Sequence, residues 1–304
     1  MSRTEAGGPT NRLADDPHEV ELPQGTLRYH DLGTGDPVLF VHGAFVNGDL
    51  WRNVAGPLAE TGAARCLVPT LPLGGHDVPM HPDADLTPTG VAALLAEFLD
   101  AVGVERVTLV GCDTGGALCQ VFLAEYPGRV ERLVLTNCDA FDNFPPREAL
   151  PFVWGARVPG VTGLFARSLR LAAVRRLAFR LLAKHPVDAE TLAGYVGTLS
   201  TDPAVQRDLR KALLGVSPRY TNRAAEAFPS FDRPVLLAWA PEDPIFPVAD
   251  AERLAELFPN ARLERIPDSY ALVPEDQPGR LVELLTDFLG ARRTAQRAHE
   301  QDTG

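Results

Sequence analysis

One acidic side chain stands between glycines where a strand pattern changes into a helix pattern. Residues 110–116 read VGCDTGG, with an apolar run at 106–110 before them and a helix-compatible run at 117–125 after them. A strand, a tight turn and a helix in this order form a nucleophile elbow, which presents one side chain at the carboxyl end of the strand. That side chain is Asp113, so the nucleophile would be a carboxylate already ionised at neutral pH. The alternative is a plain glycine-rich turn with an N-capping aspartate.

The composition excludes several other classes of protein. The chain has 304 residues, 45% of them hydrophobic, and a net charge of -11, which argues against binding to nucleic acid or anionic membranes. It contains neither a run of about 18 apolar residues nor an apolar N-terminal signal, nor the glycine patterns of dinucleotide or phosphate loops. Its four cysteines fit neither a disulfide framework nor a zinc site. We expect a cytoplasmic protein with a small-molecule partner, no metal and an undetermined oligomeric state.

Strand and helix patterns alternate on both sides of the elbow. Short apolar strands are expected at 37–41, 65–68, 130–135, 234–239 and 261–266, after a hairpin at 20–31, with helices at 49–60, 87–100, 250–258 and 278–289. Continuous apolar strands separated by helices are typical of a mostly parallel sheet covered on both faces, which is an α/β fold.

An all-helical stretch interrupts this alternation at 141–225, where prolines divide segments rich in Ala, Leu and Arg. Such an insertion is typical of a helical cap over the core formed by 19–140 and 226–291. Residues 1–18 and 292–304 are polar and are expected to be loose tails.

This organisation resembles the α/β-hydrolase superfamily over roughly residues 20–290. Within it, an aspartate at the elbow resembles the epoxide hydrolases and haloalkane dehalogenases. The resemblance implies the α/β-hydrolase fold and cofactor-free chemistry, in which the aspartate forms an alkyl-enzyme ester. A histidine-activated water then hydrolyses that ester, and a second acid orients the histidine.

Other parts of the family's site can be placed on this sequence by the same resemblance. The His42-Gly43-Ala44 turn matches the oxyanion loop, so the backbone N–H groups of Ala44 and Thr114 would stabilise oxyanions. We interpret His42 itself as structural.

The orienting acid is expected after the strand at 234–239. There Asp243 is favoured over its neighbour Glu242. Asn137 lies where some relatives place a second polar group, and it could equally be a capping residue.

The catalytic histidine is missing from its usual place. When the chain is aligned on the trailing PEDQP segment at 274–278, the expected histidine falls on Ala271. Ala271 could be natural divergence or an engineered substitution, and Tyr270 beside it favours divergence. His76 and His185 are the candidate replacements for the base, although a loop residue and a helix-end residue are the simpler interpretations.

Hints about the substrate are weaker. The halide-binding Trp and Asn of haloalkane dehalogenases are replaced by Thr114 and Ala44, which counts against that activity. Tyr195 and Tyr220 of the cap could protonate an epoxide oxygen, and Trp154 could line the cap face; ordinary packing would also explain all three.

The sequence therefore predicts a capped enzyme with Asp113 as nucleophile and Asp243 as supporting acid, acting on a small apolar substrate. We expect epoxide-hydrolase-like chemistry with an impaired ester-hydrolysis step. The alternatives are a lyase or cyclase, and a ligand-binding protein without turnover.

Overall fold

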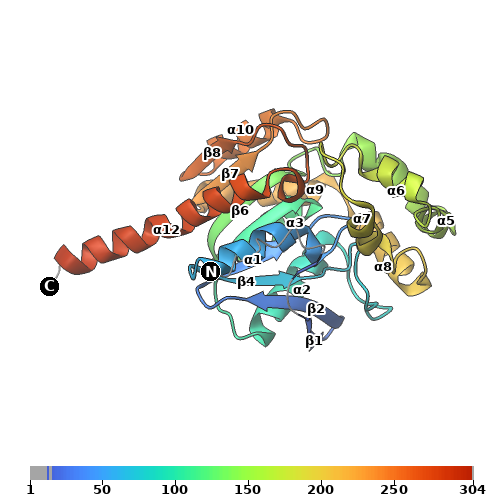
Figure 1. The fold of residues 1–304 in the computed structure, drawn as a ribbon, viewed down its shortest axis with the longest axis horizontal. Coiled ribbons are helices and arrows are strands. Elements are labelled where there is room, and N and C mark those ends of the chain that lie inside the picture. The colour runs from blue at the N-terminus through green and yellow to red at the C-terminus, as the bar shows by residue number, and fades with distance from the viewer. Residues whose placement is uncertain (1–11, 14–15, 303–304) are drawn as a thin grey trace, which may run out of the picture.

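A single eight-stranded sheet forms the centre of the molecule (Figure 1). The computed structural model describes residues 12–13 and 16–302, with side chains described as far as 290. The strands lie in the order β1-β2-β4-β3-β5-β6-β7-β8. Their bounds are β1 His18–Leu22, β2 Gly25–Leu32, β3 Asp36–Val41, β4 Ala64–Pro69, β5 Val107–Asp113, β6 Val130–Cys138, β7 Val235–Trp239 and β8 Ala261–Arg265.

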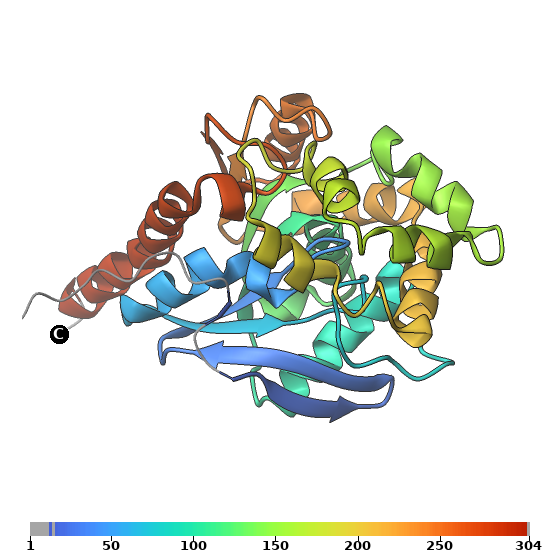
Figure 2. The same ribbon diagram turned by 45° about the vertical axis from the view of Figure 1, so that its right-hand side comes forward.

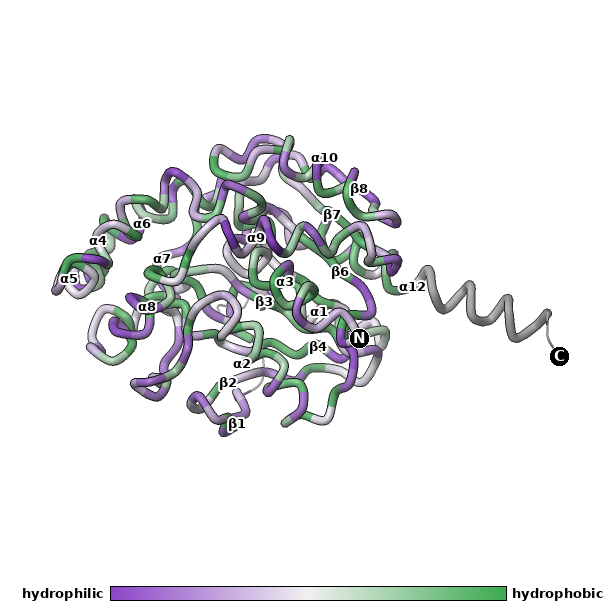
Figure 3. Tube along the Cα trace, turned by 180° about the vertical axis from the view of Figure 1, so that it is seen from behind, coloured by the Kyte–Doolittle hydropathy of each residue, from purple (hydrophilic) through white to green (hydrophobic). Residues whose placement is uncertain are grey.

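Only β2 runs opposite to the other strands. β1 pairs antiparallel with β2 and β2 with β4, whereas the pairs from β4 to β8 are all parallel. The predicted α/β fold with a mostly parallel sheet is therefore confirmed. Hydrophilic residues concentrate on the edge strands β1 and β8, and hydrophobic residues follow the central strands (Figure 3).

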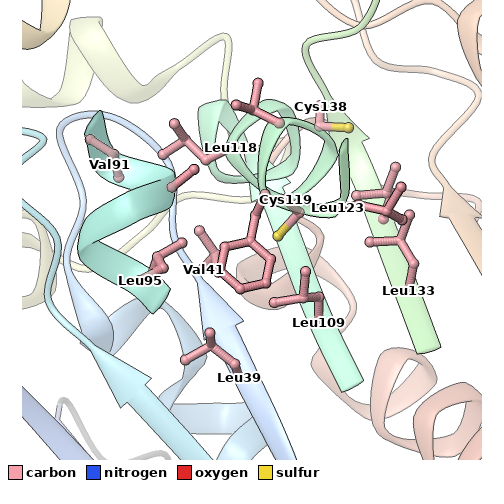
Figure 4. Packing of buried hydrophobic residues seen from close by; sticks show 14 of the residues in the cluster. Leu39, Val41, Val91, Leu95, Leu109, Leu118, Cys119, Leu123, Leu133 and Cys138 are labelled. Carbon is pink, nitrogen blue, oxygen red and sulfur yellow. The ribbon is translucent and has the colours of Figure 1, made fainter. Parts of the chain in front are cut away.

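Helices cover both faces of the sheet because the central strands are apolar on both faces. Val38 and Phe40 of β3 join one core cluster, whereas Leu39 and Val41 of the same strand join the other. Figure 4 shows the second cluster, in which β3 and β5 pack against α2 and α3. The core helices are α1 Arg52–Glu60, α2 Pro88–Ala101, α3 Thr114–Glu125, α10 Val248–Leu257, α11 Val273–Asp276 and α12 Pro278–Asp302.

The chain between β6 and β7, which is described throughout, forms helices and loops without a strand. These helices are α4 Leu150–Ala156, α5 Val161–Ser168, α6 Ala172–Phe179, α7 Ala189–Val196, α8 Pro203–Gly215 and α9 Pro218–Ala225. Helices α4–α8, called the inserted helices below, lie together beyond the carboxyl ends of the parallel strands (Figures 1 and 2). Helix α9 instead packs against α3, so it belongs to the layer that covers the sheet.

The C-terminal segment differs from its prediction. We expected 292–304 to be loose, yet α12 continues to Asp302 (Figure 1). The segment is rich in Arg, Ala and Gln and contains neither Gly nor Pro before residue 304, so nothing in it stops a helix. Of the predicted N-terminal tail 1–18, residues 1–11 and 14–15 lie outside the described residues, and β1 begins at His18.

Two further features bear on the predictions. Within the described part of the chain, no helix is both long and apolar enough to cross a bilayer. All four cysteines are buried and free of disulfides, as expected for reduced core residues.

Candidate active site

Asp113 occupies the turn that the sequence predicted. It is the last residue of β5 and the N-cap of α3, with φ 56° and ψ -137°. A positive φ is rare for a residue other than glycine and marks a strained backbone, which commonly occurs at functional sites.

Glycines around the turn make this backbone possible. A Cβ on Gly115 would lie 2.2 Å from the carbonyl oxygen of Val41, and a Cβ on Gly43 would lie 2.6 Å from the Cβ of Asp113. Both distances are far below van der Waals contact, so only glycine fits. The close packing of β3 and its loop against the turn fixes where the Asp113 side chain points.

Two backbone N–H groups, those of Thr114 and Ala44, hold the Asp113 carboxylate. Its Oδ1 accepts a hydrogen bond from the backbone N–H of Thr114, and the N–H of Ala44 also bonds this carboxyl group. Burial raises the pKa of Asp113, and the hydrogen bonds from Thr114 and Ala44 oppose that rise because they stabilise the ionised form.

Asp113 lines an apolar cavity of about 420 Å³ between the sheet and the inserted helices. Its lining includes Phe45, Phe144, Phe152, Phe165, Leu182, Leu209, Leu213 and Phe246. Four lining residues have polar side chains, namely Asp113, Thr114, Asp139 and Glu148. Among the described lining residues none is a histidine, lysine or arginine. An apolar pocket with a few convergent polar groups is the usual form of a small-molecule site.

Asp139 is a functional candidate that the sequence analysis missed. It directly follows β6, is 1% exposed and lines the cavity with Asp113. The sequence pattern ended this strand at 135, three residues before its observed end at Cys138. The three residues are Thr136, Asn137 and Cys138, which do not continue the apolar run, so the pattern gave no sign that the strand reaches Asp139.

Asp243 lies at the carboxyl end of β7, as expected, but not in the cavity lining. Its Oδ2 accepts a hydrogen bond of 2.8 Å from Asn137 Nδ2, and its Oδ1 accepts one of 2.8 Å from the N–H of Ile245. Burial raises the pKa of Asp243 to about 7, against the effect of these hydrogen bonds. Asn137 therefore positions Asp243 and does not face a ligand. Glu242, the less favoured alternative, pairs with Lys184 at the surface.

Ala271 is fully buried, and it too is absent from the described cavity lining. Its carbonyl oxygen lies 3.3 Å from Cys112 Sγ, so it is next to the residue that precedes Asp113. The backbone N–H of the next residue, Leu272, donates to the carbonyl of Leu182 at 2.8 Å, and Leu182 lines the cavity. The loop before α7, which carries Leu182, thus packs directly against residues 271–272.

His42 is structural, as interpreted from the sequence. Its Nδ1 lies 2.8 Å from the carbonyl of Gly43, and the N–H of Leu71 donates to its Nε2 at 2.7 Å. Burial lowers the pKa of His42 to about 4, so the ring is neutral.

His76 is neither an exposed loop residue nor a neighbour of the cavity. It is 3% exposed, and its Nε2 lies 3.3 Å from Asp208 Oδ2 on α8. Asp208 also accepts hydrogen bonds from Arg207 and from the N–H of Met80, which fastens α8 to the loop after β4. His76 is not among the residues of the described cavity lining. His185, at the surface, lies 3.0 Å from Asp268.

The three aromatic residues suggested for the substrate side also lie outside the described lining. The hydroxyl of Tyr195 is bound to Arg52 and Glu275, the hydroxyl of Tyr220 accepts a hydrogen bond from Arg219, and Trp154 is 58% exposed. These positions agree with the simpler interpretation from the sequence, in which the three residues have ordinary packing or surface roles.

Comparisons with known proteins agree with this architecture. Residues 36–278 match the family model described as the alpha/beta hydrolase fold. The chain is 26% identical over 286 residues to haloalkane dehalogenase 2 of Mycobacterium tuberculosis, covering 88% of this chain and 92% of the relative. It is 27% identical over 269 residues to 2-hydroxy-6-oxo-2,4-heptadienoate hydrolase of Pseudomonas putida, covering 86% and 92%.

A third relative and two solved structures extend the comparison. Cis-3-alkyl-4-alkyloxetan-2-one decarboxylase of Shewanella oneidensis is 25% identical over 305 residues, covering 91% of this chain and 89% of the relative. An alpha/beta hydrolase fold protein from Burkholderia ambifaria superposes with a TM-score of 0.78 at 25% identity, covering 91% and 99%. A haloalkane dehalogenase from Bradyrhizobium elkani does so with a TM-score of 0.74 at 21% identity, covering 92% and 99%. The family match spans most of the chain, and this protein belongs to the alpha/beta hydrolase fold family.

Proposed function

We propose that this protein is an α/β-hydrolase-fold enzyme that uses Asp113 to attack a small apolar electrophile, in the manner of an epoxide hydrolase. The observation that carries the proposal is the Asp113 carboxylate, which ends in an apolar cavity on a strained turn. The inserted helices would act as a cap that excludes water. The buried free cysteines are compatible with the cytoplasmic location we propose.

In the proposed reaction an Asp113 oxygen forms a bond to an epoxide carbon, and the carbon–oxygen bond of the ring breaks. The product is an ester on Asp113 that carries a neighbouring hydroxyl. Hydrolysis of the ester would place an oxyanion at the N–H groups of Ala44 and Thr114. Ala271 at the proposed histidine position would leave that second step without its usual base, which typically contributes about 10²–10⁴-fold. The ester should therefore accumulate.

Intact mass spectrometry after incubation with small apolar epoxides and alkyl halides tests this proposal. We expect a mass increase equal to one substrate group, located on Asp113 by peptide mapping and absent from Asp113→Asn. If a broad panel of both substrate classes leaves no adduct, covalent catalysis by Asp113 is refuted.

Restoring a histidine tests the assigned role of Ala271. Ala271 is fully buried and the loop carrying Leu182 packs over it, so Ala271→His alone would overpack the site. We expect the double variant Ala271→His/Leu182→Ala to shorten the lifetime of the adduct and raise turnover, whereas Leu182→Ala alone should do neither. An adduct of equal lifetime in all three proteins would remove Ala271 from the catalytic alignment.

A second candidate is a non-hydrolytic enzyme or a ligand-binding protein. The observation in its favour is that no histidine occurs among the described residues of the cavity lining. The name of the Shewanella oneidensis relative, a decarboxylase, gives this class a precedent within the family. Tight binding of an apolar molecule without chemical change would select the binding protein. A haloalkane dehalogenase is less favoured, because Thr114 and Ala44 offer no side-chain N–H to a halide.

A further inference from the structure

Asp139 is a second carboxyl group in the same cavity as Asp113. Its side chain is 1% exposed, yet neither oxygen makes a hydrogen bond of ordinary geometry to any described residue. The hydroxyl of Thr114 is the neighbouring side-chain group that stabilises the ionised form of the Asp139 carboxyl group. A buried carboxyl group without full hydrogen bonding is costly to keep, so its presence in the cavity wall calls for a role.

The sheet brings Asp139 beside Asp113. In the register of β5 and β6, Asp113 is opposite Cys138, so Asp139 is the next residue along the neighbouring strand. The Thr114 hydroxyl acts on both carboxyl groups. The amide of Gln120 on α3 donates to the Asp139 carbonyl at 2.8 Å and fixes the backbone there.

The two carboxyl groups have unequal surroundings. Asp113 receives backbone N–H bonds from Thr114 and Ala44, which favour its ionised form. Asp139 has the Thr114 hydroxyl and its own backbone N–H near its carboxyl group, but burial together with the charge of Asp113 outweighs both and raises its pKa well above the usual range. No lysine, arginine or histidine occurs among the described lining residues to hold a second negative charge. Asp113 therefore carries the charge and Asp139 the proton.

Ring opening of an epoxide requires such a proton, because the departing oxygen would otherwise leave as a strongly basic alkoxide. The tyrosines expected to supply it, Tyr195 and Tyr220, lie outside the described cavity lining. We propose that Asp139 is the general acid that protonates the substrate oxygen while Asp113 attacks carbon. This inference rests on the proposed function of Asp113 and adds the proton donor to it.

The step balances as follows. The Asp113 carboxylate forms the new carbon–oxygen bond, the ring carbon–oxygen bond breaks, and its electron pair takes the proton of the Asp139 carboxyl. The site then holds a neutral ester with a hydroxyl group and an ionised Asp139. An alkyl halide would need no proton, because a halide ion leaves as a weak base.

This difference between substrates gives the test. Asp139→Asn keeps the shape of the side chain but has no acidic proton to give. We expect the rate of Asp113 ester formation with an epoxide to fall roughly 10²–10⁴-fold in Asp139→Asn, and the rate with an alkyl halide of similar size to change only a few-fold. Asp142→Asn is the matched control, since Asp142 follows the same strand, is exposed and pairs with Asn222 away from the cavity. It should leave both rates unchanged.

A second test needs no variant: it measures how the rate of ester formation in the unmodified protein depends on pH. Ester formation from the epoxide should slow as pH rises through the raised pKa of Asp139, because the proton donor is then lost. Ester formation from the alkyl halide should show no such loss. The other titratable groups facing Asp139 are Asp113 on β5, Asp250 on α10 and the neighbouring thiol of Cys138, with Glu148 at the cavity rim. The titration of any of these groups would change the rates of ester formation from the epoxide and from the alkyl halide in the same way.

The outcomes separate the two proposals. If the unmodified protein forms no ester with either substrate, the role of Asp113 fails and the role of Asp139 with it. If it forms both esters, and Asp139→Asn reacts with the epoxide as fast as the unmodified protein does, Asp139 is not the acid although Asp113 remains the nucleophile. Should Asp139→Asn fail to fold, matching pH profiles for the two substrates would overturn the proposal equally well.

Discussion

Three buried carboxyl groups stand at the ends of three adjacent strands. Asp113 ends β5, Asp139 follows β6 and Asp243 follows β7, and burial raises the pKa of each. In a triad, a protonated histidine would partly compensate such charges. The described cavity lining contains no histidine, and the three carboxyl groups interact with backbone N–H groups, with the Thr114 hydroxyl and with the Asn137 amide.

The stability of the protein should respond to the charge on Asp243. Its pKa is about 7 in the folded protein and near 3.8 in the unfolded chain, so the folded state binds more protons between these values. The free energy of unfolding should therefore fall as pH rises from about 4 to about 7. At 1.36 kcal/mol per pKa unit the loss is up to roughly 4 kcal/mol.

Urea unfolding at pH 5 and pH 8 measures this loss. We expect Asp243→Asn to lose less stability than the unmodified protein between the two pH values, because the amide does not ionise. Asp113 and Asp139 contribute in the same direction, so the loss should shrink and not vanish. An unchanged difference between the two pH values would show that Asp243 is not buried as described.

At the scale of elements, the junction of β3, β5 and α3 leaves no room for a side chain at Gly43 or Gly115. Gly115 is the second residue of α3, and the carbonyl oxygens of Val41 and His42 lie 2.2 and 2.5 Å from the position of an added Cβ. Backbone atoms cannot move aside as a flexible side chain can. The position of the Asp113 carboxylate thus depends on the absence of a side chain two residues away.

We therefore expect Gly115→Ala to lower the free energy of unfolding by about 3 kcal/mol or more and to abolish ester formation on Asp113. Gly128→Ala is the matched control, because Gly128 is exposed and an added Cβ there meets nothing within 4 Å. It should stay within about 0.5 kcal/mol of the unmodified protein. Thermal or urea unfolding together with the mass assay would measure both effects, and equal stability of the two variants would contradict the packing argument.

At the scale of the whole molecule, a buried ion pair between two core helices also holds α7, one of the inserted helices, through the hydroxyl of Tyr195. Arg52 on α1 donates to both oxygens of Glu275 on α11, at 2.6 and 2.8 Å, and at 2.9 Å to the hydroxyl of Tyr195 on α7. Both charged side chains are 6% exposed. The position of α7 over the sheet therefore depends on polar contacts as well as on apolar packing.

Removing one partner of this pair should be far more damaging than removing both. Arg52→Leu leaves the Glu275 carboxylate buried without its cation, and we expect a loss of about 3–5 kcal/mol in the free energy of unfolding. Arg52→Leu/Glu275→Leu should recover part of that loss. The control Arg28→Leu breaks an exposed pair with Glu19 and should cost less than about 1 kcal/mol. A double variant no more stable than Arg52→Leu would show that the buried charge is not the cause.

The sequence alone determined the features that depend on local order along the chain. Apolar runs located the central strands, a turn between two short strand patterns located β1 and β2, and the glycines beside Asp113 indicated its turn. Strand burial and steric limits act over a few neighbouring residues, so local sequence carries these signals. Asp243 could be placed at the end of its strand for the same reason.

Only the tertiary structure decided what depends on contacts between distant segments. His76 meets Asp208, 132 positions away, and Tyr195 meets Arg52 and Glu275, so neither is available to a substrate as their places in the sequence suggested. Asp139 became visible only when the register of β5 and β6 set it beside Asp113. Burial and pairing of such polar groups arise from the packing of whole layers, whose geometry no short stretch of sequence contains.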